Sequence, residues 1–243
     1  MIADPQVKAY KDLLQHYTVM AGASPPNPTS VSEASSLLTA ATQQPHFVDV
    51  ALTVLKSIPL SIDELNMTTT FLKNKFKFDF ELLDRSKLTL YYQDLVRVAE
   101  VVPSCRSAPF SAVCQSLALI YINVATGEQL KVSDFVKPFL PLSGQSPVLY
   151  DYYFKVMEEI AASLSNERVV LDDSLRIVVR QQVESQQAEV MFLLEEHCDL
   201  AWSQPEIDKD VIFECLASWA EISHDALEQL PSHRVMQRLI ETL

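Results

Sequence analysis

Apolar residues recur at intervals of three and four positions along most of the chain, and strict alternation over five or more residues is hard to find. Spacings of three and four place apolar side chains on one face of an α-helix, whereas a half-buried β-strand would alternate. Val7, Tyr10, Leu14 and Tyr17 show the helical spacing near the amino terminus. The pattern therefore predicts an all-α fold.

Breaks rich in proline and glycine divide this pattern into helices, because proline cannot continue a helix and glycine often ends one. A first helix ends before Gly22 and the prolines at 25–28. The segment 171–202 contains neither residue, so it is expected to form one helix of about thirty residues. The helices after the first are expected at 30–44, 45–57, 61–77, 84–102, 108–126, 131–140, 147–164, 171–202, 206–222 and 232–243.

Taken in pairs after the leading helix, these segments form five helical hairpins at a spacing of about 35 to 60 residues, close to that of HEAT and armadillo repeats. The signatures of tetratricopeptide and ankyrin repeats are missing. We therefore expect a HEAT-repeat-like α-solenoid of about five hairpins plus a leading helix, spanning 1–243 as a single domain. A weaker subdivision separates the first repeats, 1–102, from the later ones, 103–243.

The last expected helix ends on apolar residues, Leu239, Ile240 and Leu243. Repeat arrays close with a terminal repeat that has a polar outer face, because an uncapped end exposes the core. The chain is therefore expected to be an amino-terminal fragment of a longer array.

Glycine is rare: Gly22, Gly127 and Gly144 occur where average usage of about 7% would give roughly seventeen. Phosphate-binding loops and dinucleotide-binding folds need glycine where the backbone approaches a ligand closely. Neither a GxGxxG nor a GxxxxGK[ST] motif occurs. The common classes of nucleotide-dependent enzyme are thus disfavoured.

The chain is acidic, with 19 Lys and Arg residues against 32 Asp and Glu residues. The excess lies in the segment 151–228, which contains 18 acidic and 5 basic residues. Such a balance disfavours direct binding to nucleic-acid phosphates and favours a basic partner. Simple solubility is the alternative explanation of an acidic surface.

Four cysteines, Cys105, Cys114, Cys198 and Cys215, lack the short spacings of metal sites. They are expected to be reduced and mostly buried. No secretory leader is recognisable near the amino terminus, and the longest apolar stretches fall short of the 18 or more residues of a membrane span. The sequence therefore predicts a protein of the cytosol or nucleus without a metal, a cofactor or a membrane partner.

The residues that could suggest a catalytic site do not have the arrangement that catalysis needs. His197 and Cys198 are adjacent on an expected helix, which points their side chains about 100° apart and prevents them from acting as base and nucleophile. Trp202 and Trp219 are expected to be core anchors, although an exposed tryptophan could receive a partner. We therefore expect no enzymatic activity.

The stretch 211–221, with the sequence VIFECLASWAE, follows a long expected helix that includes 175–182 and 192–198. A repeat helix with a Cys-Leu-x-Ser-Trp core after a long helix resembles the amino-terminal region of karyopherins of the importin-beta superfamily. The nearest branch is that of transportin-SR and importin thirteen. Similar stretches at 69–76 and 112–120 occur in the same order.

This resemblance implies a receptor that shuttles between cytoplasm and nucleus and that contacts nucleoporins. It also implies binding of the GTPase Ran, in its GTP state, on the inner, second helices of the first repeats. Basic or phosphorylated nuclear proteins would be the cargo. A HEAT-like scaffold that assembles proteins without any link to transport remains the alternative.

The candidate Ran-binding residues lie on the second helix of the second expected hairpin. Thr89, Gln93, Arg97 and Glu100 follow one another at spacings of four, four and three, so they share one helix face. A plain solvated face is the alternative interpretation, because most exposed helix faces bind nothing.

A second set of candidates is acidic and lies in the fourth expected hairpin. Asp172, Asp173, Glu184 and Glu189 would meet a basic partner there. Asp172 and Asp173 also suit a helix start, where carboxylates complement the helix dipole. The alternative of a solvated face applies to this set as well.

Overall fold

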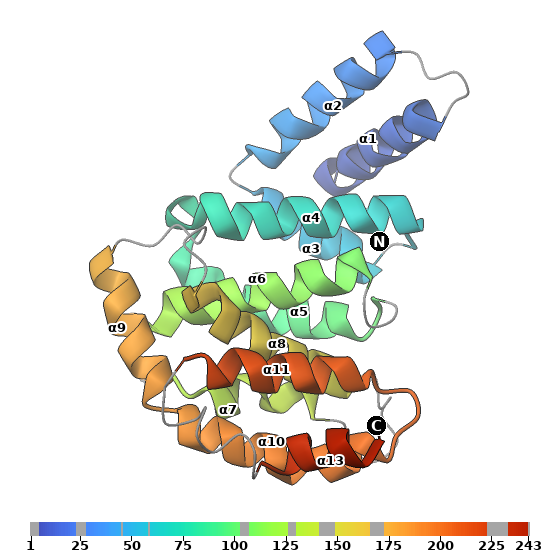
Figure 1. Ribbon diagram of the computed structural model, residues 1–243. Helices are drawn as coiled ribbons and strands as arrows, with labels where there is room; N and C mark the ends of the chain where they lie inside the picture. Colours follow the sequence, from blue (N-terminus) through green and yellow to red (C-terminus); the bar gives the residue numbers. More distant parts are fainter. Residues whose placement is uncertain are drawn as a thin grey trace. The chain divides into compact units, whose positions relative to one another are not determined.

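A computed structural model of the chain describes residues 5–22, 28–44, 46–57, 59–102, 107–125, 130–140, 149–165, 173–222 and 233–242. Every regular element in these ranges is an α-helix or a short 3-10 helix, which confirms the predicted all-α fold (Figure 1). The chain divides into two compact units, Met1–Val102 and Pro103–Leu243, here called unit 1 and unit 2.

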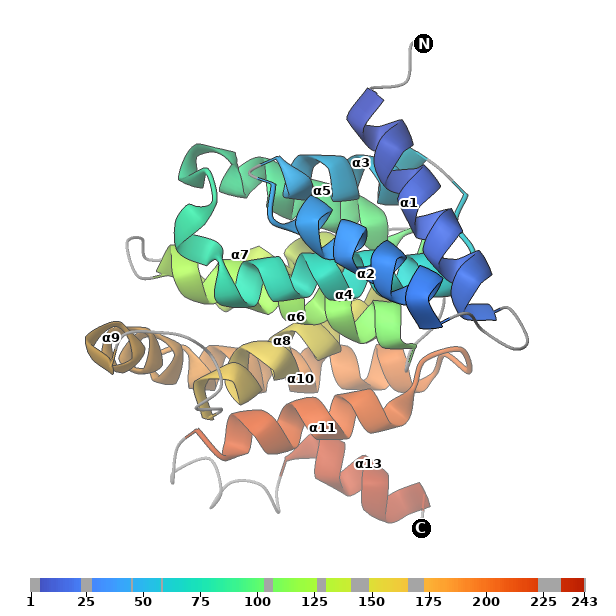
Figure 2. The ribbon, with the colours of Figure 1, turned by 90° about the horizontal axis from the view of Figure 1, so that it is seen from above.

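Unit 1 begins with a packed pair of helices, α1 and α2, which run side by side (Figure 2). Helix α3 packs against α1, α4 and α5, so α1, α3 and α5 form one row with α3 in the middle. The elements of unit 1 are α1 (Pro5–Gly22), α2 (Pro28–Thr42), α3 (Phe47–Ser57), α4 (Ile62–Phe78), η1 (Phe80–Leu82), η2 (Arg85–Lys87) and α5 (Leu88–Ala99).

The start of α4 is fixed by a capping box. Ser61 donates its backbone N–H to the Glu64 carboxylate (2.7 Å), and its hydroxyl accepts the Glu64 backbone N–H (3.3 Å). Two N–H groups that have no partner within the helix are thereby satisfied. In the core, Tyr10 of α1 packs edge-on against Phe47 of α3 at 5.5 Å between ring centres.

Unit 2 contains two rows of helices. Helix α8 lies between α6 and α11 (Figure 1), whereas α10 contacts α7 and α13. Contacts of α7 with α8 and of α10 with α11 join the two rows. The elements of unit 2 are α6 (Ala108–Ala125), α7 (Val132–Val136), η3 (Lys137–Phe139), α8 (Leu149–Ser165), α9 (Asp173–Glu184), α10 (Gln187–Trp202), α11 (Lys209–Ala220) and α13 (Arg234–Thr242).

Aromatic side chains fill the core of unit 2. Tyr152 of α8 packs against Phe110 of α6 and Phe139 of η3, with ring centres 4.5 and 5.9 Å apart. Trp219 of α11 is fully buried, as expected of a core anchor, and its indole N–H donates to the Met157 carbonyl of α8 (2.9 Å). The row of α6, α8 and α11 is thus held by both apolar burial and a directed hydrogen bond.

Helix α6 is the one helix of the described residues that is long and apolar enough to cross a membrane. Of its residues, Ala108–Ala125, 72% are buried inside the protein. Core helices of soluble proteins have the same composition, so this helix is explained by its packing.

The expected helix over 171–202 is broken in two: α9 ends at Glu184 and α10 begins at Gln187. At the break, the side chain of Gln186 bonds to residues outside α9 and α10. Its Oε1 accepts the Val132 N–H (2.7 Å), and its Nε2 donates to the Tyr121 hydroxyl (3.2 Å). A glutamine inside a continuous helix gives no sequence signal of such a break, which is why the prediction was wrong.

The expected pairing of the helices is wrong for the first three hairpins, whereas the helices of the fourth and fifth, α8 with α9 and α11 with α13, do contact each other. The packed pairs in unit 1 are α1 with α2 and α3 with α4, whereas the prediction joined 30–44 to 45–57 and 61–77 to 84–102. In unit 2, α6 packs mainly on α8 instead of on α7, which occupies the expected partner segment 131–140. Periodicity locates a helix, but it does not identify the helix that covers its apolar face.

Candidate functional site

The expected polar face of α5 is exposed. Thr89, Gln93 and Arg97 project into solvent from α5, and Glu100 is exposed in the turn that follows. Arg97 lies 3.6 Å from Asp94 of the same helix. The structure therefore brings these four candidates together on one surface, although α5 stands in the row of α1 and α3.

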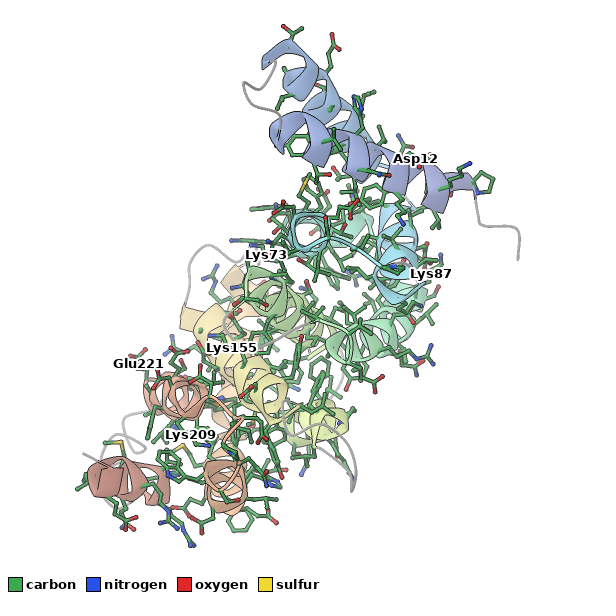
Figure 3. All side chains as sticks on the ribbon, turned by 90° about the vertical axis from the view of Figure 1, so that its right-hand side faces the viewer. Asp12, Lys73, Lys87, Lys155, Lys209 and Glu221 are labelled. Atoms are coloured by element: carbon green, nitrogen blue, oxygen red, sulfur yellow. The ribbon has the colours of Figure 1, made fainter. Side chains whose placement is uncertain are left out.

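One ion pair fixes this helix to α3, and a second fixes η2, directly before it, to the same helix. Lys56 of α3 pairs with the buried Asp94 (2.7 Å), and Lys87, labelled in Figure 3, pairs with Asp49 of α3 (2.7 Å). A hydrogen-bonded pair at a helix contact sets the orientation of the two helices more than it adds stability. These contacts present the exposed face of α5 in a defined orientation.

Of the four acidic candidates, the structure describes the side chains of Glu184 and Glu189, which lie on different helices. Asp172 lies outside the described residues, as does the side chain of Asp173, which opens α9. Glu184 accepts a hydrogen bond from the Arg180 guanidinium (2.8 Å) one helical turn away. Its charge is therefore compensated within α9.

Glu189 forms part of the contact between α10 and α7. Its carboxylate accepts a hydrogen bond from the Ser133 hydroxyl (2.6 Å) and lies 3.2 Å from the Lys131 ammonium. These hydrogen bonds, that from Ser133 first, lower the pKa of Glu189. The carboxylate thus holds two helices together.

His197 and Cys198 form no catalytic pair. His197 contacts the rings of Tyr150 and Tyr153, 6.1 and 5.3 Å between ring centres, and burial lowers its pKa. Burial raises the pKa of the Cys198 thiol to about 11, which leaves it protonated at neutral pH. A protonated, buried thiol is not a nucleophile.

The remaining cysteines in the described ranges, Cys114 and Cys215, are also free and buried. Cys105 lies outside the described residues. Within the same ranges, no three His, Cys, Asp or Glu side chains gather as metal ligands.

A charged cluster surrounds Lys155 of α8, labelled in Figure 3. Its ammonium contacts Glu158 and lies 3.8 Å from Glu159 and 3.4 Å from Glu214 of α11. Gln115 of α6 donates to the Glu159 carboxylate (3.2 Å). The cluster links α6, α8 and α11, so it belongs to the packing of that row.

No family model matches the chain, and no curated protein matches it as a relative. The resemblance to importin-beta karyopherins therefore rests on the stretches 69–76, 112–120, 175–182, 192–198 and 211–221 of the sequence itself.

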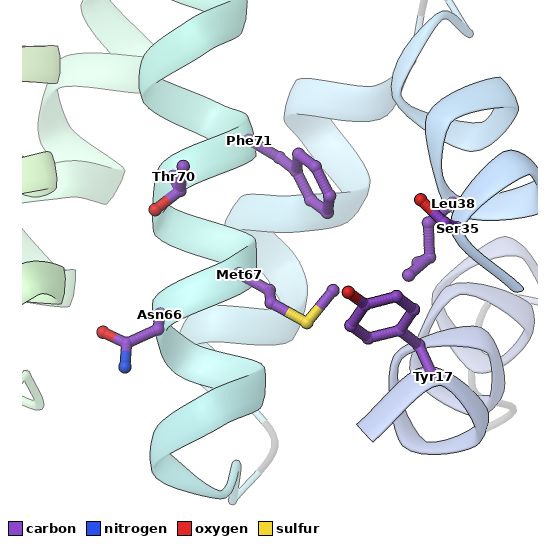
Figure 4. Close-up of a pocket in the computed structure, with 7 residues that line it drawn as sticks. All are labelled: Tyr17, Ser35, Leu38, Asn66, Met67, Thr70 and Phe71. Atoms are coloured by element: carbon purple, nitrogen blue, oxygen red, sulfur yellow. The ribbon is translucent and has the colours of Figure 1, made fainter. Parts of the chain in front are cut away.

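A pocket of about 360 Å³ opens in unit 1 between α4 and the pair of α1 and α2 (Figure 4). Met67 and Phe71 point from α4 toward Tyr17 and Leu38, whereas Asn66 projects from another side of α4. Tyr17 is the one ionisable group in the lining, so the pocket offers apolar contact rather than acid–base chemistry.

One exposed face was missed by the sequence analysis. Phe192 and Leu200 of α10 are 62% and 51% exposed, and the exposed Glu196 lies between them. Their spacing of four and eight residues was the available signal, since it defines one side of a helix. The expectation of a single helix over 171–202 hid that signal.

Asp199 of α10 holds α13 through two arginines. Its carboxylate contacts Arg234 and accepts two hydrogen bonds from the Arg238 guanidinium (3.0 and 2.8 Å). The bond from Arg238, with the charge of Arg234 contributing, lowers the pKa of Asp199. Since the lowered pKa belongs to the folded state, this contact stabilises above the unfolded pKa and is lost as pH falls through the folded one.

We expect the amides of α13 to lose their protection from hydrogen exchange in acid, as pH falls below the ordinary aspartate range and through the lowered pKa of Asp199. Asp199→Asn should produce the same loss at neutral pH, while Glu206→Gln, an exposed neutralisation in the same unit, should not. The measurement is exchange over 234–242, corrected for the intrinsic rate at each pH. Unchanged protection in Asp199→Asn would refute this role.

Proposed function

We propose that this chain is a segment of an α-solenoid nuclear transport receptor of the importin-beta type, which binds Ran in its GTP state. In that role it would move between cytoplasm and nucleus and take part in carrying protein cargo. The observation that carries the proposal is the packing of alternate helices in rows within each unit: α1, α3 and α5 in unit 1, and α6, α8 and α11 beside α7, α10 and α13 in unit 2.

Rows of alternate helices are typical of solenoids, because each repeat buries its apolar face mainly against its neighbours in the sequence. Under this proposal, packed pairs such as α1 with α2 and α10 with α11 would be the repeating units. An array of this kind presents extended surfaces for other proteins. Protein binding is thus the activity that the packing favours.

The packed pairs change the helix on which Ran is expected. In the receptors that the sequence resembles, Ran occupies the second helices of the first repeats. With α1 paired to α2 and α3 to α4, these second helices are α2 and α4, while α5 stands in the row of first helices. We therefore assign Ran to the surface of α2 and α4 and keep the α5 face as the competing site.

The test is an equilibrium titration of the full chain with Ran loaded with a non-hydrolysable GTP analogue and, separately, with GDP. We expect at least about tenfold tighter binding of the GTP form, a difference of about 1.4 kcal/mol. A scaffold without a link to transport has no reason to distinguish the two nucleotides. Equal or absent binding would therefore remove the proposal.

Two charge reversals locate the surface. Lys73 is half-exposed on α4, and Arg97 is exposed on α5 (Lys73 is labelled in Figure 3). Lys73→Glu is expected to weaken binding of the GTP form several-fold, because it places a repulsive charge in the assigned surface. Arg97→Glu serves as the matched control and should bind as the unaltered chain does. The opposite ranking would move Ran to the α5 face.

A further inference from the structure

The outer face of α10 forms a stripe of exposed side chains, here called the α10 stripe: Ala188, Phe192, Glu196 and Leu200. Residues four positions apart lie one turn above each other, so the stripe runs about 18 Å along the helix. Phe192 and Leu200 are 62% and 51% exposed, although most large apolar side chains of unit 2 are buried. The stripe is thus an unpartnered apolar surface with a carboxylate at its centre.

The opposite face of α10 is firmly packed. Val190, Leu194, Cys198 and Ala201 are almost fully buried, and α10 contacts α7, α11 and α13. A helix held on this face keeps its backbone in a fixed position, so a partner does not have to order the helix on binding. The stripe is therefore presented on a rigid support.

Three cations that border α10, Lys131, Arg234 and Arg238, are paired with its own carboxylates, and a fourth, Lys209, donates to the Ala201 carbonyl at its end. Lys131 lies 3.2 Å from Glu189, and Arg238 lies 2.8 Å from Asp199, which also contacts Arg234. Helix α10 itself contains no lysine or arginine. The three paired cations therefore add no net positive charge beside the stripe, and Lys209 lies in the field of three other carboxylates, those of Asp151, Glu206 and Asp208.

Glu196 remains uncompensated, because it forms no ion pair with any described residue. The sequence of unit 2 adds a long-range field of the same sign, with 21 acidic and 10 basic residues over 103–243. Such a field attracts basic partners and repels nucleic acid and anionic membrane surfaces. The negative charge of Glu196 and of unit 2 therefore favours an apolar partner that also carries basic residues.

We propose that the α10 stripe binds an amphipathic, basic helical segment of a partner protein. Apolar side chains of the partner cover Phe192 and Leu200, and a lysine or arginine between them pairs with Glu196. Since Phe192 and Leu200 are about 12 Å apart along the helix, the partner carries apolar residues seven or eight positions apart. This surface lies in unit 2 and is independent of the Ran site proposed for unit 1.

The experiment measures fluorescence anisotropy of a labelled helical peptide of leucine and lysine, with leucines at heptad spacing, titrated with the full chain. Phe192→Ser and Leu200→Ser are each expected to weaken binding about tenfold, as loss of a central apolar contact does. Glu196→Lys should weaken it as well and should reduce its dependence on salt. A second peptide with glutamate in place of lysine should bind at least about tenfold more weakly.

Matched controls come from the same unit. Ile177→Ser on α9 removes a side chain that is 58% exposed, and Glu206→Lys reverses an exposed charge outside the stripe. Both should bind the lysine peptide within about twofold of the unaltered chain. Circular dichroism verifies folding, and Glu196→Lys, which removes no apolar contact, keeps the test valid if Phe192→Ser fails to fold.

The proposal is overturned if the controls weaken binding as much as the stripe variants, or if Phe192→Ser and Glu196→Lys bind normally. Preference for the glutamate peptide would also overturn it. So would binding to phosphatidylserine vesicles that is lost in Phe192→Ser, because the stripe would then belong to a membrane surface. Failure of Ran binding would leave all these outcomes unaffected, so the two proposals can fail separately.

Discussion

Replacing Trp219 with alanine is expected to lower the free energy of unfolding of unit 2 by about 3–5 kcal/mol. The indole is fully buried between α11 and α8, and its N–H donates to the Met157 carbonyl at 2.9 Å. Alanine would leave a cavity in the row of α6, α8 and α11 and would remove that hydrogen bond. The loss is measured by urea denaturation. The signal is the fluorescence of the remaining Trp202, which lies in the same unit.

Two further variants separate burial from hydrogen bonding. Trp219→Phe keeps most of the buried ring and loses the indole N–H, so we expect a smaller loss of stability. Trp202→Ala is the matched control, because Trp202 is only half-buried, edge-on against Phe213 at 5.4 Å. If Trp202→Ala destabilised as much as Trp219→Ala, the central position of Trp219 in the core would be refuted.

Replacing Gln186 with alanine is expected to destabilise unit 2 by about 2 kcal/mol, because it leaves a buried backbone N–H without an acceptor. The Oε1 atom of Gln186 accepts the Val132 N–H at 2.7 Å, and Val132 is fully buried. Its Nε2 atom also donates to the Tyr121 hydroxyl. Urea denaturation followed by tryptophan fluorescence reports the change.

Gln181→Ala provides the control for this prediction. Gln181 is exposed on α9, and its removal should change stability by no more than about 0.5 kcal/mol. An equal loss in the two variants would mean that glutamines of α9 and α10 act through helix propensity. In that case the hydrogen bonds of Gln186 would not be the source of the stability lost in Gln186→Ala.

Helix positions could be read from the sequence, because each helix needs one apolar face whatever covers it. The segment 108–126 became α6 (Ala108–Ala125), and 61–77 became α4 (Ile62–Phe78). The break at Gln186 could not be read, since it depends on Tyr121 and Val132, which lie 65 and 54 positions away. Contacts over such distances leave no local pattern.

The same distinction between local pattern and long-range contact applies to the candidate surfaces. Exposure of Thr89, Gln93 and Arg97 followed from the spacing of polar residues on α5. Glu184 and Glu189 looked available for a partner, but Arg180 and Ser133 occupy them. Composition counts charges without showing which of them are already paired, and only the packed structure separates these two carboxylates from Glu196.

Hydrogen exchange of the full chain, with and without Ran carrying a non-hydrolysable GTP analogue, tests the central claim most directly. The proposed receptor predicts new protection over 28–42 and 62–78, the helices α2 and α4, with α3 and α5 unchanged and no effect of Ran·GDP. Absence of any nucleotide-dependent protection within unit 1 would contradict it.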